Sequence, residues 1–545
     1  MSTEETPKTK PSLFKASGSV GLSTLLSRVL GLFRDMLIAK TFGAGAQTDA
    51  FFVAFRIPNL LRSLLAEGSL STAFMPVLAE EERKSHEAAV QAVRAILSFM
   101  TIITIVLSII GMFYAKELTL LFAPGFGEGT AKTELASYLL RIMFPYLVLV
   151  TLLALAGGVL NAHGSFALPA LGPAIMNLVM LISMLLIPGN AGIEALAWSV
   201  LLGGVIALAP QVYLTYRKGF SLRWASPLSN PAVGKVCKLM LPAVFSSSLY
   251  QILIFINTLL ASLLIERSIS WLFYADRLFQ FPIGVFSLAI ATALLPSLSR
   301  RAAAGDIQGL GDEICGALRW TVFIAAPATA GLIILGEPII RTLFERGQFS
   351  AYDTTQSARA LVAYCIGIIP ASCQSILIRS FLAQKRVGVA TAINSASVVV
   401  NILLALMLLG PAQTESVTLL SKYLASFAEA LNLLPLGHVG LALAWSLATW
   451  FACILSALML RKVGVKLNLA ELLHSFSRTF VATNAMSAAL ITLMRLDAPS
   501  VFLVFIGIPL GAIIYWASGL MLNSSESLAT KEVSYEYLRK WKRKN

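Results

Sequence analysis

Charged side chains are scarce in this chain. Only 13% of its 545 residues are Asp, Glu, Lys or Arg, against about 25% in soluble domains, and 57% are hydrophobic. The mean hydropathy is +0.78. This composition excludes a soluble enzyme held by one anchor and predicts an all-α polytopic membrane protein. The polar N-terminus, MSTEETPKTKPSLFK, lacks the apolar core and cleavage site of a secretory signal, so we expect no removable signal peptide.

Cysteine and histidine are equally scarce. The five cysteines and four histidines are scattered without the spacing of metal ligands, so we expect buried structural thiols. The sequence also lacks a P-loop and any paired-carboxylate, Ser/His or HExxH arrangement suited to catalysis. An enzyme therefore has little support. The net charge of +14 does not indicate nucleic-acid binding, because Lys and Arg follow the expected membrane topology.

Long hydrophobic runs are abundant. A membrane span needs roughly 20 mainly apolar residues. Fourteen segments meet that length, namely 17–42, 50–79, 92–121, 134–161, 168–188, 193–216, 236–264, 269–299, 315–344, 356–384, 388–410, 437–460, 472–494 and 499–521. Lys and Arg are concentrated in alternate connections, and the connection PGNAG (188–192) has neither. The positive-inside rule then predicts that both termini are cytoplasmic.

The chain also resembles itself at an offset of 220 residues. STAFMPVLAE (71–80) matches ATALLPSLSR (291–300), and each ends a long apolar segment. An even number of helices per repeat keeps both repeats in one orientation, so we expect two pseudo-symmetric six-helix lobes around a central cavity. The predicted division is a cytoplasmic N-tail (1–16), an N-terminal lobe (17–230), a C-terminal lobe (231–461), two last spans (462–522) and a basic cytoplasmic tail (523–545).

One apolar segment is predicted not to span. In 414–435 the apolar residues are spaced alternately three and four apart, with Lys422 and Glu429 off that stripe. This pattern is typical of an amphipathic helix at the outer membrane interface. A linker helix packed on the bundle fits the pattern equally well.

Several arginines lie inside predicted spans. The first span carries Arg28 and Arg34, and the second carries Arg56 and Arg62. A charge at membrane depth is costly and usually faces a protein interior or a water-filled cavity. Arginine suits phosphate because its planar fork stays charged and donates several hydrogen bonds. These residues therefore predict a cationic site for an anionic substrate.

Acidic residues accompany these arginines. Asp35, Asp49 and Glu67 are the nearby carboxylates, and they are outnumbered by the four arginines. One interpretation is that Asp35 only neutralises an arginine and lets two helices pack. Because an unpaired buried cation is costly, some of the arginines should still meet an outside anion or water.

The second repeat contributes a similar pair. Asp276 and Arg277 lie in WLFYADRLFQFPIG, close to the repeat equivalent of Arg56. A local Asp–Arg pair at a helix interface is the alternative.

The second span is expected to bend, because Pro58 lies within it and Gly68 follows.

Three stretches carry a family resemblance. SRVLGLFRD (27–35), FGAGAQTDAFFVAFRIPNLLRSLLAEGSLSTAFMPVLAE (42–80) and FYADRLFQFPIGVFSLAIATALLPSLS (273–299) resemble the MurJ/MviN family. These are lipid II flippases of bacterial cell-wall synthesis, in the multidrug/oligosaccharidyl-lipid/polysaccharide exporter superfamily. The resemblance implies fourteen helices, a central cationic cavity and a groove beside the last two helices for a polyprenyl tail.

The resemblance also assigns residues. It implies substrate-binding roles for Arg28, Arg34, Arg62 and Arg277, with Arg56 at a basic position. It implies supporting or gating roles for Asp35, Asp49 and Glu67, and Asp276 joins that set from its place beside Arg277. Some relatives bind sodium, for which the weak candidates here are Asn257, Asn394, Asn401 and Thr449. Hydrogen bonds between packed helices are the alternative for these four.

The expected function is therefore a flippase of the bacterial cytoplasmic (inner) membrane. It would move lipid II, the undecaprenyl-pyrophosphate-linked peptidoglycan precursor, from the inner to the outer leaflet by alternating access. The membrane potential or a cation gradient would drive it, with sodium or a proton as the coupling ion and no other cofactor. We expect a monomer. Its expected partners, besides lipid II, are membrane lipids and the cell-wall synthesis machinery, and we expect no binding of nucleic acid.

Other functions stay open at this stage. A cation-coupled drug exporter of the same superfamily and a flippase for another polyprenyl-linked oligosaccharide are the nearest. A membrane enzyme acting on a polyprenyl phosphate would need catalytic carboxylates or histidines. A non-catalytic scaffold in wall assembly would tolerate loss of the buried arginines.

Overall fold

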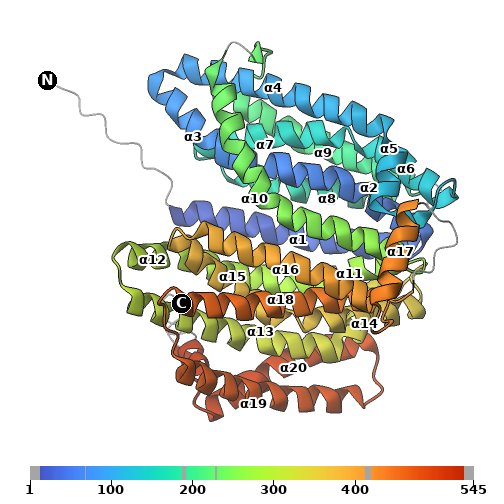
Figure 1. The fold of residues 1–545 in the computed structure, drawn as a ribbon, viewed down its shortest axis with the longest axis vertical. Helices are drawn as coiled ribbons and strands as arrows, with labels where there is room; N and C mark the ends of the chain where they lie inside the picture. The colour runs from blue at the N-terminus through green and yellow to red at the C-terminus, as the bar shows by residue number, and fades with distance from the viewer. Residues whose placement is uncertain (1–12, 68, 187–191, 228–229, 412–418, 533–545) are drawn as a thin grey trace, which may run out of the picture. The chain divides into compact units, whose positions relative to one another are not determined.

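The computed structural model describes residues 13–67, 69–186, 192–227, 230–411 and 419–532. All regular secondary structure in these ranges is helical (Figure 1). The chain forms two compact units. The first comprises the chain up to Arg267 together with 419–422, and the second comprises the rest.

The first unit is made up, in the elements that can be delimited among its described residues, of ten α-helices, a π-helix and a 3₁₀ turn. They are α1 (Leu13–Phe42), α2 (Ala46–Arg62), the π-helix η1 (Ser63–Glu67), α3 (Ser69–Lys84), α4 (His86–Phe113), α5 (Ala115–Phe122), the 3₁₀ turn η2 (Pro124–Phe126), α6 (Ala131–Met143), α7 (Tyr146–Ala162), α8 (Ala167–Leu186), α9 (Glu194–Arg217) and α10 (Pro231–Ser262).

Packing in the first unit places two helices that matter for the site. α1 lies along α8, and α10 lies along α3 and η1. An apolar core of α3, α4, α7 and α10 side chains, including Phe74, Ile96 and Val236, is buried from solvent. Burial of such side chains stabilises each by roughly 1.5–3 kcal/mol in water. α10 is thus part of the first compact unit.

The second unit repeats the order of the first from α2 onward, and two further helices follow. Its described helices are α11 (Ser268–Pro282), the π-helix η4 (Ile283–Ser287), α12 (Leu288–Ala303), α13 (Ile307–Phe344), α14 (Ala351–Cys365), α15 (Ile368–Ala383), α16 (Val387–Leu408), most of α17 (Leu419–Leu431), α18 (His438–Lys462), α19 (Leu469–Met494) and α20 (Ser500–Met521). α19 and α20 pack on each other and on α13 (Figure 1).

The two halves correspond at the predicted offset. The π-helices begin at 63 and 283, α6 and α14 begin at 131 and 351, and α8 and α16 begin at 167 and 387, each 220 residues apart. The N-caps Thr130 and Ser350 also correspond, and each side chain accepts a hydrogen bond from the third helical N–H. The predicted six-plus-six repeat is therefore confirmed. The lobe boundary at 230/231 rests on the repeat and stays a prediction, whereas the compact units divide after Arg267.

Every predicted span coincides with a helix or a bent helix pair. Eight helices in the described chain are long and apolar enough to cross a membrane, and two bent pairs raise the number to ten. The remaining four predicted spans fall on α1, α2–α3, α10 and α19. α1 carries Arg28, Arg34 and Asp35 within its apolar run, as the sequence indicated.

The segment predicted to be amphipathic is also helical. α17 (Leu419–Leu431) lies within it, and residues 412–418 are outside the described chain. Ala428 is buried, whereas Tyr423 and Phe427 are more than half exposed. Leu433 and Leu436 then donate backbone hydrogen bonds to the last carbonyls of α16. The choice between a membrane-interface helix and a packed linker stays open.

Candidate functional site

Arg34 is buried and tied to two helices. Its Nε and Nη2 donate to Asp35 Oδ1 at 2.9 and 2.6 Å, and its Nη1 donates to Asn177 Oδ1 at 2.8 Å. Arg34 and Asp35 are 6% and 1% exposed. Arg34 therefore joins α1 to α8, and Asp35 neutralises it within α1.

Asn177 lies on α8, where sequence reasoning singled out no residue. Its Nδ2 donates to the backbone carbonyl of Ser27 at 3.0 Å, and the residue is 7% exposed in a largely apolar helix. The sequence offered one signal for Asn177, which is the only amide side chain in its predicted apolar span. Buried polar groups are costly unless they are hydrogen-bonded.

Arg28 differs from Arg34 in its surroundings. It lies six residues before Arg34 on α1 and is half-buried. It makes no hydrogen bond or ion pair within the described part of the chain. A half-buried guanidinium with no internal partner is available to an outside anion.

Asp49 forms a second buried polar cluster at the start of α2. Its Oδ2 accepts from Lys132 Nζ on α6 and from the Arg267 backbone N–H after α10, both at 2.9 Å. The Lys132 ammonium also lies 4.3 Å from the Phe126 ring centroid. Asp49 is 1% exposed. It therefore holds the ends of three helices together, and sequence reasoning missed Lys132 as its partner.

Arg56 and Arg62 lie on α2, next to the π-helix η1. Arg56 donates to Thr258 of α10, and Arg62 Nε donates to Asn59 Oδ1 at 2.7 Å on its own helix. Gln251 of α10 donates to Ser63, the first residue of η1, at 2.8 Å. The predicted bend in this span is a π-helix, which begins five residues after Pro58. Glu67 ends it, and the Glu67 side chain is outside what the structure describes.

Arg277 lies in the second unit, on α11. It is exposed, and its guanidinium lies 4.6 Å from the Phe273 ring centroid. Asp276 accepts a hydrogen bond from Gln280 Nε2 at 2.5 Å. At the start of the same helix, Trp271 Nε1 donates to the buried Asp353 at 2.9 Å, so α11 is tied to α14 much as α2 is tied to α6.

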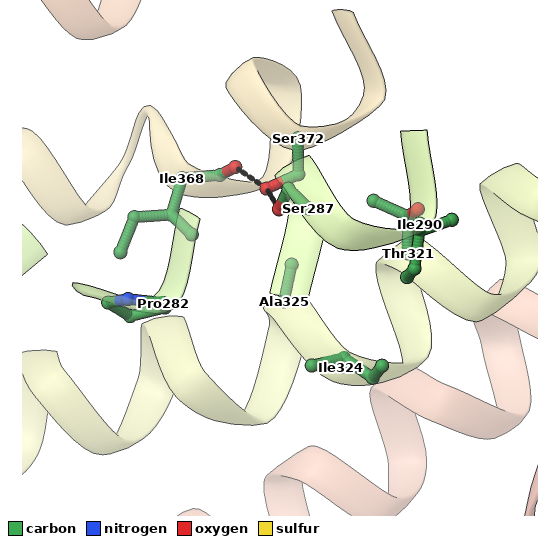
Figure 2. Close-up of a pocket in the computed structure, with 8 residues that line it drawn as sticks. All are labelled: Pro282, Ser287, Ile290, Thr321, Ile324, Ala325, Ile368 and Ser372. Carbon is green, nitrogen blue, oxygen red and sulfur yellow. Dashed lines mark hydrogen bonds between the residues drawn. The ribbon is translucent and has the colours of Figure 1, made fainter. Parts of the chain in front are cut away.

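The π-helix of the second unit packs against α15 and α13. Figure 2 shows Ser287 donating to Ser372 at 2.6 Å and Ser372 donating to the Ile368 carbonyl at 2.7 Å. A narrow pocket lies beside these hydroxyls. Thr321 of α13 lines the pocket, and its buried Oγ1 has no hydrogen-bond partner among the described residues.

The four weak sodium candidates do not form one site within either unit. Asn257 is in the first unit, and the other three are in the second. Thr449 donates to the Trp445 carbonyl of its own helix at 2.8 Å, and Asn394 is exposed. Asn401 is buried, and its amide has no partner in the described chain. Their sodium roles stay predictions.

Known proteins match this chain in sequence over most of its length. A family model described as lipid II flippase MurJ matches residues 38–510. A lipid II flippase MurJ from Burkholderia cenocepacia is 36% identical over 461 residues, covering 83% of this chain and 84% of the relative. A probable lipid II flippase MurJ from Vibrio cholerae is 34% identical over 510 residues, covering 90% of each chain.

Solved structures agree. A structure of lipid II flippase MurJ in an inward closed conformation matches with a TM-score of 0.76 at 25% identity, over 93% of this chain and 98% of that one. An inward-facing multidrug MATE transporter of the MOP superfamily matches with a TM-score of 0.65 at 15% identity, over 81% and 94%, and shows a shared fold alone.

These matches settle the class of protein. The chain is a multi-pass membrane protein and a transporter, not a catalytic enzyme, as its composition and missing catalytic motifs predicted. The model match and both relatives extend over most of its length. The chain therefore belongs to the MurJ family of lipid II flippases.

Proposed function

We propose that this chain translocates lipid II from the inner to the outer leaflet of the bacterial cytoplasmic membrane by alternating access. The observation that carries the proposal is Arg28, a half-buried guanidinium on a spanning helix with no partner in the described chain. A half-buried, unpaired cation at membrane depth is costly, and an anionic ligand would neutralise it. The pyrophosphate of lipid II has that charge.

The other arginines differ in how many of their hydrogen bonds are already made within the protein and in how exposed they are. Arg34 is held by Asp35 and Asn177, so it shapes the site and keeps α1 on α8. Arg62 is half-buried and Arg277 is exposed, and both are proposed, like Arg28, as direct substrate contacts. Arg56 is a further proposed contact. Asp49 would gate the outer end by holding or releasing Lys132 and the turn after α10.

The energy source follows from the substrate charge. With both termini cytoplasmic, an inside-negative potential favours outward movement of an anion by roughly 2.3 kcal/mol per charge per 100 mV. A sodium or proton gradient would reset the empty transporter. The apolar tail can stay in lipid while only the head group enters the protein.

The test is outer-leaflet exposure of the lipid-linked precursor in cells depleted of this protein and of any second flippase. Wild type should restore exposure, whereas Arg28→Ala and Arg277→Ala should leave it low at normal membrane abundance. Arg341→Ala is the matched control, because Arg341 is exposed on α13 and already paired with Glu337 and Glu345. It should restore exposure like wild type.

Two outcomes would contradict the proposal. Unchanged exposure on depletion would remove the transport assignment and favour a scaffold. Normal exposure accompanied by a drug-resistance profile would favour the exporter. Collapsing the potential or the sodium gradient in the same assay separates the two energy sources.

A further inference from the structure

Asn177 touches both parts of α1 that carry arginine. Its Oδ1 accepts from Arg34 Nη1 at 2.8 Å, and its Nδ2 donates to the carbonyl of Ser27, the residue before Arg28, at 3.0 Å. One amide on α8 therefore contacts α1 at two points almost two turns apart.

The Arg34–Asp35 pair needs such a third group. Adjacent residues on a helix point about 100° apart and do not face each other. Asp35 alone therefore leaves the direction of the Arg34 guanidinium loosely defined. An acceptor on a different helix fixes the third nitrogen, and a planar guanidinium with all three nitrogens engaged has one orientation.

α1 is shaped to admit the amide. A Cβ placed on Gly31 would lie 3.3 Å from Asn177 Nδ2, closer than side-chain carbons normally approach. Gly31 lies one turn after Ser27, at the point where Nδ2 reaches the Ser27 carbonyl. A carbonyl has two lone pairs, so Ser27 can accept this bond in addition to its helical one.

We infer that Asn177 is a positioning residue for substrate binding, which orients Arg34 and fixes the turn of α1 that presents Arg28. The inference rests on the proposed function, because it assigns Asn177 to that same pyrophosphate site. Asn177 itself does not contact the substrate. Its effect passes through the two arginines, much as outer-shell hydrogen bonds orient the ligands of a metal.

The experiment measures binding of undecaprenyl pyrophosphate to the purified full-length protein, alongside its thermal midpoint. Asn177→Leu removes both hydrogen bonds at similar size and should weaken binding by about tenfold or more, since a bond to a charged group is lost. Gly31→Ala, which crowds the amide from the other helix, should weaken it in the same direction. The thermal midpoints check that both variants stay folded at the temperature of the binding assay.

A double variant separates positioning from packing. If Asn177 acts largely through Arg34, Asn177→Leu should weaken the Arg34→Ala protein much less than it weakens wild type. Gln211→Met is the control, because Gln211 on α9 is a buried amide with no hydrogen-bond partner in the described chain. It should bind the probe like wild type.

The outcomes are distinguishable. Wild-type protein that does not bind the probe would contradict the proposed function and this inference with it. Binding by wild type that is unchanged in Asn177→Leu overturns the inference alone. Fully additive losses in the double variant, or a loss in Gln211→Met as large as in Asn177→Leu, would also overturn it, because both indicate general packing.

Discussion

At the scale of single residues, two arginines six positions apart on one helix have opposite surroundings. Arg34 is 6% exposed and neutralised by Asp35, whereas Arg28 is half-buried without a partner in the described chain. Removing one member of a buried pair leaves the other charge uncompensated. Removing an unpaired cation relieves a cost.

The two residues should therefore separate stability from transport. Arg34→Ala leaves the Asp35 carboxylate buried and should destabilise the protein by about 3–5 kcal/mol, seen as a lower thermal midpoint in detergent. Arg28→Ala should leave the midpoint unchanged or higher while abolishing precursor exposure. Equal midpoints for the two variants would contradict this division.

Sequence reasoning found the charged residues but missed two of their partners. A charge inside an apolar run is visible without a structure, so Arg28, Arg34 and Asp35 were identified. Asn177 and Lys132 were not, because each is 83 or more positions from the residue it binds and only the fold brings them together. Asp35 pairs with Arg34, and its supporting or gating role stays a prediction.

At the scale of elements, hydroxyl groups lie in and around the π-helix η4, and they differ in whether they have a hydrogen-bond partner. Ser287, Ser372 and the Ile368 carbonyl form a continuous chain of hydrogen bonds (Figure 2). Thr321 faces the same narrow pocket with a buried hydroxyl that lacks a partner in the described chain. An unmade buried hydrogen bond costs more than a made one contributes.

Opposite stability changes are expected at this element. Thr321→Val keeps the shape and removes the unsatisfied hydroxyl, so it should stabilise the protein by about 1 kcal/mol. Ser372→Ala breaks the chain at its middle and should destabilise it by about the same amount. Thermal unfolding in one detergent checks both, and a lower midpoint for Thr321→Val would show that its hydroxyl is in fact satisfied.

The two broken spans also show that the sequence pattern does not determine the type of helix break. Pro58 and Gly68 predicted an irregular second span, which was right, but they did not specify a π-helix. The corresponding break in α11–η4 follows Pro282, which was not singled out as a break. A wider turn depends on which carbonyls neighbouring helices can satisfy, and that information is not local in sequence.

At the scale of the whole molecule, the last two helices are attached to α13 by an ionic cluster after α20. Arg319 Nε donates to Glu526 at 2.8 Å, and Arg319 also contacts Glu471 of α19 and Ser525. Glu526 is 2% exposed and also accepts from Ser475 and Ser524. One arginine thus connects three segments of the second unit.

This cluster should weaken in acid. Burial raises the pKa of Glu526, but hydrogen bonds from Ser524, its own N–H and Arg319 outweigh burial and hold the pKa below its ordinary 4.5. A lowered carboxylate pKa contributes stability above the unfolded value, and that stability is lost as pH falls through the folded value. Wild type should therefore be more stable than Glu526→Gln at neutral pH.

The difference between the two proteins should disappear as pH falls below about 4.5. Thermal midpoints across pH 3–7 provide the measurement. Arg319→Ala is a second test from the other partner and should lower the midpoint at neutral pH. A gap between wild type and Glu526→Gln that persists unchanged in acid would contradict the assignment.

The two π-helices have a consequence for the history of the chain. Each lies at the same place in its repeat, beginning at 63 and at 283. A π-turn arises when one residue is inserted into an α-helix, and two independent insertions at one position are less economical than one. Duplication of a half-length chain whose helix was already broken at this point would account for both breaks.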